Sequence, residues 1–169
     1  MKNLHELFLN ELSLMLDAEK QIIKALPNVI KAASSKELKD ALRHHLKETK
    51  GQVRRLELIF KQLDRRPLRV HSKAMKHLLA EAGRVIQARY TAHVKDAALI
   101  NCAQHVEHFE IASYGALKSL AKSFEYYRIY DLLEDTAKEE GNANKKLTEI
   151  AEGTTFTKGI NLKALKQAA

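Results

Sequence analysis

The sequence has little of what interrupts a helix or crosslinks a chain. Its 169 residues include two prolines, six glycines, one cysteine and no tryptophan. The single cysteine, Cys102, excludes an intramolecular disulfide, and we therefore expect a reducing, cytoplasmic location. No run of about 18 apolar residues occurs, which excludes a transmembrane helix. The opening segment MKNLHELFLNEL mixes charges into its apolar positions, which indicates an amphipathic helix rather than a secretory signal.

The residues that are abundant favour one helical domain. Ala, Leu, Lys and Glu dominate, and all four are good helix formers. The length suits a single domain with a sizeable core. Apolar residues recur with helical spacing almost from end to end. This periodicity predicts helices over residues 4–33, 35–63, 72–89, 92–122 and 126–151.

Four of these helices are long, and the one over 72–89 is short. Tight turns join the first two long helices and the last two, and the short helix lies in the longer connection between the pairs. We therefore predict an all-α, ferritin-like four-helix bundle with a short crossover helix between helices 2 and 3. Pro27 should kink or locally break the first helix. The bundle should span residues 1–153, with a basic, irregular tail over 154–169 packed on it or trailing from it.

The charge is unevenly distributed. The net charge is +8, and residues 61–95 contain nine Lys or Arg residues against two acids. Such a segment can attract nucleic acid or another anionic surface. It can equally be a solubilising surface, and no aromatic interleaving or recognition motif accompanies it.

Each long helix carries one glutamate near the middle of its apolar stripe. A carboxylate in that position costs free energy unless it is protonated, paired or bound to a cation. In the second helix, a rival stripe through Leu42 and Phe60 would place the glutamate nearer the edge. The four residues are Glu19, Glu48, Glu107 and Glu140.

The four glutamates are also predicted to lie at one level. In the first hairpin, one glutamate precedes the turn near Ser34 by almost the same length of chain by which the other follows it. The two glutamates of the second hairpin flank the turn near Phe124 in the same nearly symmetrical way. At about 1.5 Å per residue, all four are roughly 21–26 Å from their turns. Carboxylates that face each other inside a bundle are the ligands that hold two iron or manganese ions, so we predict a dinuclear metal site.

Other polar residues lie beside these positions. Glu110 is three residues after the third-helix glutamate and shares its face, as a second ligand or an outer base. Gln52 could hydrogen-bond a ligand or simply satisfy a polar core, and Tyr114 is expected in the core with its hydroxyl bonded to a carboxylate. We interpret His45 and His108 as hydrogen-bonded packing residues rather than ligands.

Four segments carry a resemblance to a known family. They resemble the ferritin-like bacterial stress-protein family that includes YciF and YciE, over roughly residues 4–151. The resemblance implies a ferritin-like bundle, a homodimer, a dinuclear metal centre and a link to general stress. It also implies that the four glutamates occupy the superfamily's carboxylate positions. The segments are DAEKQIIKALP (17–27), HLKETKGQVRRLE (45–57), DAALINCAQHVEHFEIASYG (96–115) and EEGNANKKLTEIA (139–151).

The sequence departs from the superfamily at two places and leaves three functions open. Ferritin-like di-iron proteins carry Glu-x-x-His in helices two and four, but Gly51 and Ala143 stand at the histidine positions. The first hypothesis is a metal-binding stress protein whose iron or manganese meets oxygen or peroxide. The second is a nucleic-acid binder that uses the basic segment. The third, which the missing histidines favour, is a non-catalytic structural or assembly protein with a degenerate site.

Overall fold

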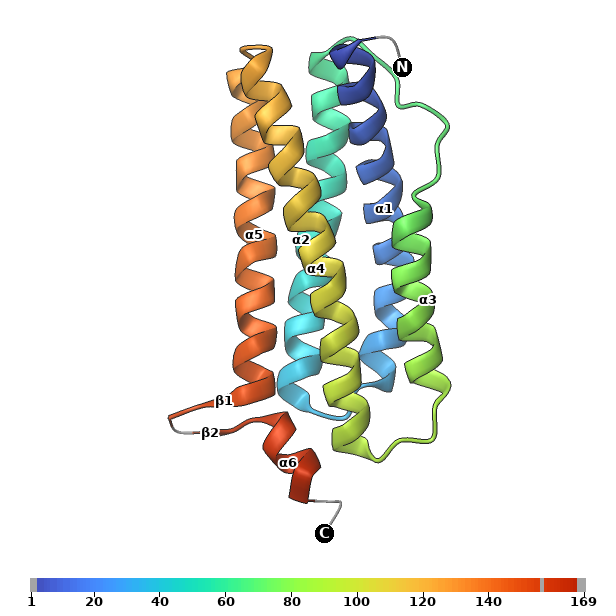
Figure 1. The fold of residues 1–169 in the computed structure, drawn as a ribbon, viewed down its shortest axis with the longest axis vertical. Coiled ribbons are helices and arrows are strands. Elements are labelled where there is room, and N and C mark those ends of the chain that lie inside the picture. Colours follow the sequence, from blue (N-terminus) through green and yellow to red (C-terminus); the bar gives the residue numbers. More distant parts are fainter. Residues whose placement is uncertain (1–2, 156, 167–169) are drawn as a thin grey trace.

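The computed structural model describes residues 3–155 and 157–166, and these are helical along almost their whole length (Figure 1). The five predicted helices are confirmed, with boundaries within two residues of those expected. None of the described helices combines the length and apolar character needed to cross a membrane. The elements are α1 (Leu4–Ala32), α2 (Lys36–Gln62), α3 (Lys73–Gln87), α4 (Ala92–Ser123), α5 (Tyr127–Glu152), β1 (Gly153–Thr154), β2 (Thr157–Lys158) and α6 (Ile160–Lys166).

Four long helices lie side by side, and α3 lies alongside them (Figure 1). The helices α1 and α2 form one antiparallel hairpin, and α4 and α5 form another. The hairpins pack together through α1 against α4 and α2 against α5. The short helix α3 packs on α1 and α4, so it covers their side of the molecule and leaves the α2–α5 side uncovered.

Buried hydrogen bonds fix the turn between α1 and α2. The Ser35 hydroxyl caps α2 by accepting from the backbone N–H of Leu38 at 3.4 Å. The carboxylate of Asp96, which is fully buried in α4, accepts from the backbone N–H groups of Ser34 at 2.7 Å and Ser35 at 2.8 Å. A charge-assisted pair of this kind ties the turn of one hairpin to a helix of the other.

The connection that leads into α3 is attached to α1. The backbone N–H of Ser72 donates to the Asp17 carboxylate at 2.8 Å, and Gln21 donates to the Ser72 carbonyl at 3.1 Å. Further back, the N–H of Leu68 donates to the Ser13 hydroxyl at 3.0 Å. These bonds satisfy backbone groups of a segment that has no regular structure of its own.

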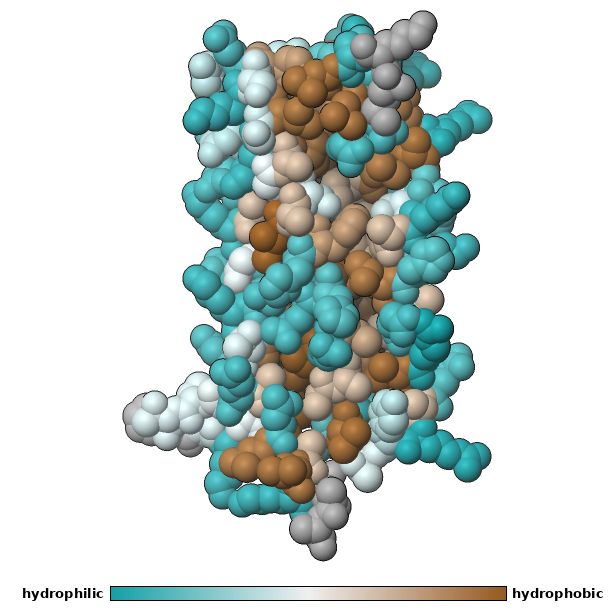
Figure 2. Space-filling view, in the orientation of Figure 1, coloured by the Kyte–Doolittle hydropathy of each residue, from teal (hydrophilic) through white to brown (hydrophobic). Residues whose placement is uncertain are grey.

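The apolar core runs along the inside of the long helices. Helix α1 continues through Pro27 as one helix, so the predicted local break does not occur. Phe8 and Phe124 pack at one end with ring centroids 5.8 Å apart. Hydrophilic side chains dominate much of the outer face in Figure 2. The core is interrupted by buried carboxylates, among them Glu19 and Glu110, whose exposed fraction is 0%.

The C-terminal segment is more regular than the sequence indicates. The strands β1 and β2 pair antiparallel, with Gly153 opposite Lys158, and α6 packs against α4 and α5. Gly153 has φ of 91°, and a Cβ at that position would lie 2.3 Å from the carbonyl oxygen of Thr157. Only glycine fits there without strain. The predicted division at residue 153 stays a prediction, and positions 1–2, 156 and 167–169 lie outside the described residues.

Candidate metal centre

Four buried ligand side chains from three helices meet inside the molecule. They are His45 from α2, Glu107 and Glu110 from α4, and Glu140 from α5. One ligand atom of each lies within 4.8 Å of the others. Three of the five predicted site residues are therefore brought together, and a histidine joins them. This cluster could hold a metal ion.

Several polar atoms of the cluster have no neutral or basic hydrogen-bond partner, and its carboxyls instead contact one another, Glu107 with Glu140 and Glu110 with Glu19. Among the described residues, the buried atoms without a partner include Oε2 of Glu107, both carboxyl oxygens of Glu110, Oε2 of Glu140 and Nδ1 of His45. Buried polar atoms normally have a partner, so several orphans in one place need an explanation. Protons shared between neighbouring carboxyls satisfy some of these atoms in the metal-free protein, and a cation among them would take the place of those protons.

The imidazole of His45 lies between two carboxyls, one facing each ring nitrogen, so either nitrogen could share a cation with its carboxyl. Nε2 of His45 is 3.6 Å from Oε1 of Glu107, and its Nδ1 is 3.9 Å from Oε2 of Glu140. Both distances are too long for direct hydrogen bonds. Ligand atoms around one ion are roughly 3–4 Å apart, because each metal–ligand bond is about 2.0–2.2 Å.

Burial and crowding shift the acid–base properties of these groups. Burial, together with the neighbouring Glu140 charge, raises the pKa of Glu107 well above its usual range. Burial and the nearby Glu19 charge do the same to the pKa of Glu110. Burial raises the pKa of Glu140 to about 7 and lowers the pKa of His45 to about 4. At neutral pH the metal-free site therefore stores protons on its carboxyls and keeps the imidazole neutral.

Glu19 joins the cluster from α1 and is held by a tyrosine. Tyr114 is fully buried and its hydroxyl donates to Oε1 of Glu19, which confirms the expected tyrosine–carboxylate contact. The other oxygen, Oε2, has no hydrogen-bond partner. Burial and the Glu140 charge raise the pKa of Glu19 to about 8. The phenol of Tyr114 thus fixes one oxygen of Glu19, and the Glu19 carboxyl also contacts Glu110.

A second set of hydrogen bonds supports the α5 side of the cluster. Gln52 donates to Glu140 and, at 3.1 Å, to Oε2 of Glu139. The guanidinium of Arg55 pairs with both oxygens of Glu139, one contact being 2.6 Å, and donates to the Thr136 hydroxyl at 3.1 Å. A bidentate arginine pair fixes a carboxylate in the plane of the guanidinium. The arrangement positions Gln52, and through it the Glu140 side chain.

Glu48, the fifth predicted residue, lies at the edge of the site. Its side chain is 20% exposed and pairs with His44 at 3.1 Å, outside the group of four ligands. The neighbouring Thr49 is fully buried. Helix α2 therefore buries a face between the two stripes visible in its sequence, and this rotation moves Glu48 outward and His45 inward. The role of Glu48 as a ligand stays a prediction.

His45 is the residue that the sequence interpretation misses. The sequence pattern favours a packing role, yet the side chain is only 6% exposed and lies between two carboxylates. A signal is present in the sequence, because His45 lies seven residues before Gln52 and hence on the same face of α2. An imidazole therefore enters the site three residues before Glu48, although Gly51 occupies the position three residues after it.

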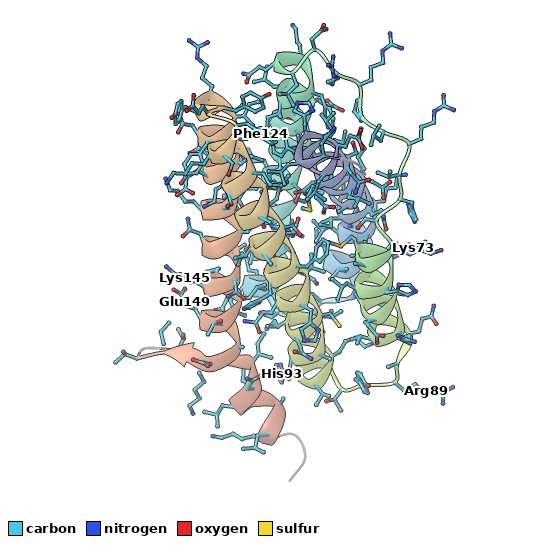
Figure 3. The ribbon with its side chains drawn as sticks, turned by 45° about the horizontal axis from the view of Figure 1, so that its top comes forward. Lys73, Arg89, His93, Phe124, Lys145 and Glu149 are labelled. Carbon is cyan, nitrogen blue, oxygen red and sulfur yellow. The ribbon has the colours of Figure 1, made fainter. Side chains whose placement is uncertain are left out.

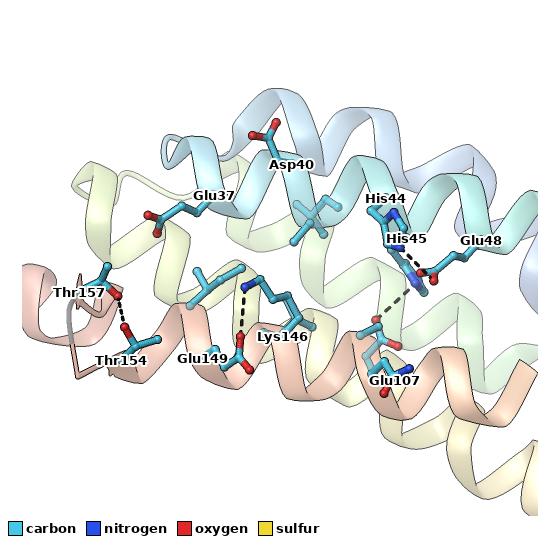
Figure 4. A pocket seen from close by; sticks show the side chains of 16 residues that line it. Glu37, Asp40, His44, His45, Glu48, Glu107, Lys146, Glu149, Thr154 and Thr157 are labelled. Carbon is cyan, nitrogen blue, oxygen red and sulfur yellow. Dashed lines mark hydrogen bonds and ion pairs between the residues drawn. The ribbon is translucent and has the colours of Figure 1, made fainter.

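An open groove between α2 and α5 leads from the surface to this cluster (Figure 4). Its volume is about 730 Å³, and His45 and Glu107 form part of its lining. Ala41 and Ala143 line it from opposite helices. Ala143 is the second position at which the superfamily's histidine is missing, so a small side chain there leaves space beside the cluster.

The basic segment lies on the other side of the molecule, over α3 and its connections. All the Lys and Arg residues of 61–95 except Lys95 are exposed. Lys73 and Arg89 extend away from the body of the molecule (Figure 3). Lys95 instead donates to the Ile86 carbonyl at 3.1 Å. The segment is thus a solvated basic surface that is separate from the buried cluster.

Comparison with known proteins gives consistent matches over nearly the whole chain. Protein YciF of Escherichia coli K12 is 38% identical over 162 residues, which cover 95% of this chain and 98% of that protein. The crystal structure of the E. coli stress protein YciF matches with a TM-score of 0.86 and 39% identity, over 88% of this chain and 94% of that chain. YcfI from Rhodopseudomonas palustris, described as a candidate structural protein, matches with a TM-score of 0.86 and 37% identity, over 89% and 96% of the two chains.

A more distant match supports the fold alone. A protein from Xanthomonas campestris pv. campestris has a TM-score of 0.75 at 19% identity, over 98% of this chain and 99% of that chain. The sequence pattern of the family described as a domain of unknown function, DUF892, matches residues 3–160. The chain belongs to this family, together with YciF.

Proposed function

We propose that this chain is a ferritin-like stress-response protein whose four long helices form a bundle around a dinuclear iron or manganese site. One observation carries the proposal. Buried carboxylates and an imidazole from three helices converge, with ligand atoms within 4.8 Å of one another and several of them without any hydrogen-bond partner. Such a group is unfavourable as an apolar core and favourable around cations.

The donor set suits iron and manganese. Oxygen ligands with one imidazole favour these ions, whereas thiolates are absent from the group of four. His45, Glu107, Glu110 and Glu140 would hold the metal, with Glu19 completing the site from α1. Each carboxyl would give up its stored proton on binding, so uptake releases protons.

The bound metal would supply a Lewis acid and a redox centre for reaction with oxygen or peroxide. The protein's own contribution is to hold the ligand side chains in position. Tyr114 orients Glu19, and Gln52 orients Glu140. Burial of the cluster side chains strengthens electrostatic interactions inside the site, although the groove leaves one side of it open.

The relatives support the stress-response part of the proposal. The E. coli relative is described as a stress protein, and the match covers nearly all of both chains. The R. palustris relative is described as a candidate structural protein, which favours the competing function in which the fold is kept and the site is degenerate. Metal content separates these two functions.

Metal per chain tests the proposal. Metal-free protein is loaded anaerobically with Fe(II), and separately with Mn(II), then desalted and analysed by mass spectrometry. About two ions per chain are expected from the bundle-type site. Glu107→Ala should lose them, and Glu57→Ala, at an exposed position of α2, should keep them. Folded wild-type protein that retains no metal would leave the structural function standing.

We also propose that the protein is a cytoplasmic homodimer, as the family resemblance implies. Large apolar side chains are exposed at several places, including Tyr127 at 64% and Leu165 at 70%. Figure 2 shows hydrophobic residues gathered at the end of the molecule that carries α6. Light scattering coupled to size-exclusion chromatography gives the mass directly. A mass of one chain at micromolar concentration would contradict the dimer.

A further inference from the structure

The groove between α2 and α5 is acidic in a chain whose net charge is +8. Its lining contains five carboxylates and one lysine, Lys146. Figure 4 shows these carboxylates spread along the groove from its outer end toward the cluster. The carboxylates are Glu37, Asp40, Glu48, Glu107 and Glu149.

The groove ends at ligand atoms that have no partner. His45 and Glu107 belong to its lining, with exposed fractions of 6% and 2%. Nδ1 of His45 and Oε2 of Glu107 form no hydrogen bond. The inner end of the groove is therefore continuous with the buried cluster, and its last groups are donors that a cation would satisfy.

The outer carboxylates remain available to a passing cation. Asp40 pairs with Arg43 at 2.8 Å, and Glu149 pairs with Lys146 at 3.1 Å. The side chains of both pairs are more than half exposed. Exposed ion pairs of this kind are weak and exchange readily with solvent ions. When no cation is bound, these ion pairs neutralise part of the negative charge of the groove, but they leave the carboxylate oxygens accessible.

Glu48 lies beside the cluster at the inner end of the groove, about one turn of α2 beyond His45 (Figure 4). Its side chain is 20% exposed, and its partner His44 is 70% exposed. Its carboxylate therefore borders both the groove and the solvent. This position explains why a glutamate at the level of the cluster is not part of the group of four.

We propose that this groove is the entry route by which a divalent cation reaches the buried cluster, with Glu48 as the groove carboxylate beside His45 and Glu107. The inference rests on the proposed function, since it needs a cluster that binds metal. It adds a second set of residues, in the groove, which determine how fast metal enters and not how much metal the cluster finally holds. A field of one sign along a groove raises the local cation concentration and the association rate.

The first test removes charge from the outer groove. Metal-free protein is mixed with Mn(II) at low ionic strength, uptake is stopped with EDTA at set times, and retained manganese is counted by mass spectrometry. The triple variant Glu37→Gln, Asp40→Asn, Glu149→Gln should load at least about threefold more slowly, because electrostatic steering changes rates by 10-fold or more. Its final occupancy should equal that of wild type.

A matched control keeps the same change in net charge. The exposed residues Glu57, Glu81 and Asp131 do not line the groove, so neutralising these three should leave the loading rate unchanged. Raising the salt concentration should slow wild type toward the rate of the groove variant. Equal rates for the groove variant and its control would overturn the inference.

The second test narrows the groove without changing charge. Ala143→Leu places a larger side chain beside the cluster, and Ala116→Leu makes the same change at an exposed position of α4. Ala143→Leu should slow loading and Ala116→Leu should not. The helical circular dichroism of both variants is checked first, and the charge variants decide the matter if Ala143→Leu does not fold.

The two proposals fail in different ways. Wild-type protein that holds no manganese even after long incubation would overturn both. Full occupancy reached at the same rate by wild type, the groove variant and Ala143→Leu would overturn the entry route alone. Glu48→Gln should load slowly to full occupancy, and a loss of final occupancy in this variant would make Glu48 a ligand and not an entry residue.

Discussion

Burying any one carboxyl group of the cluster costs free energy, but together the groups can bind a cation. Each of Glu19, Glu107, Glu110 and Glu140 is nearly or fully buried, and burial is the largest cause of the raised pKa of all four. A buried carboxyl remains neutral until a cation compensates its charge. The metal-free protein therefore holds protons where the loaded protein would hold metal.

The first prediction concerns pH and the metal-free protein. A carboxyl whose pKa is higher in the folded than in the unfolded chain stabilises the folded state at low pH, and this contribution is lost as pH rises through the folded value. Because the pKa is about 7 for Glu140 and about 8 for Glu19, against about 4.3 in the unfolded chain, we expect these groups to lower the melting temperature as pH increases from about 5 to 8. Thermal unfolding monitored by circular dichroism, with EDTA present, measures this.

His45 sets the acid limit of that window. Burial lowers its pKa to about 4, so its effect is opposite in sign and the stability it contributes is lost only as pH falls toward that value. Above the usual histidine range of about 6.5 only the carboxyls act. Glu140→Gln should flatten the decrease between about pH 5 and 7. A wild-type melting temperature that rises across pH 7 and 8 would contradict the buried, protonated carboxyls.

The sequence predicts where each long helix begins and ends, but it does not predict which face α2 turns toward the core. Boundaries followed from apolar periodicity, and the common level of Glu107 and Glu140 followed from the fixed rise per residue. The face of α2 was ambiguous because two apolar stripes compete along it, and only packing against α1 and α5 decides between them. That rotation places His45 in the cluster and Glu48 at its edge, and the seven-residue spacing of His45 and Gln52 is the one sequence signal for it.

The C-terminal elements were also beyond the sequence pattern, since β1, β2 and α6 are too short to show periodicity. Gly159 allows them to pack. A Cβ at this position would lie 2.3 Å from the carbonyl oxygen of Ala151 and 2.4 Å from the backbone nitrogen of Gly153. Backbone atoms cannot move aside as a side-chain end can, so any larger residue must displace the segment.

The second prediction tests this packing with two glycine variants. Gly159→Ala should release α6 and increase amide hydrogen exchange over Ile160–Lys166, at a cost of about 1–3 kcal/mol. Gly83→Ala, in α3, meets nothing within 4 Å and should instead stabilise the protein by about 0.5–1 kcal/mol. Unchanged exchange over α6 in Gly159→Ala would show that the close approach is not required.

Basic side chains outnumber acidic ones over residues 61–95, whereas acidic side chains outnumber lysine in the lining of the groove. The basic surface lies over α3, which packs on α1 and α4, and the acidic groove lies between α2 and α5. The net charge of +8 would repel cations if it were spread evenly. Concentrating carboxylates in the groove gives cations a favourable approach, while the basic surface remains available for solubility or for an anionic partner.

The third prediction is that metal stabilises the entire fold. A ligand that binds only the folded chain at 100 times its Kd adds about 2.7 kcal/mol. For a chain of this size that corresponds to roughly 5–10 °C in Tm. Mn(II) should produce such a shift at pH 7.5, and excess EDTA should reverse it. Glu107→Ala should show no shift, and an equal shift in that variant would place the binding elsewhere.

The location of bound metal tests the central claim most directly. Crystals of the protein loaded with Mn(II) are measured near the manganese absorption edge, and the anomalous difference density is calculated. We expect two peaks among His45, Glu107, Glu110, Glu140 and Glu19, with the strongest contacts to the atoms that lack hydrogen-bond partners. Fully loaded crystals with no anomalous peak at this cluster, or with peaks only on the surface, would contradict the account.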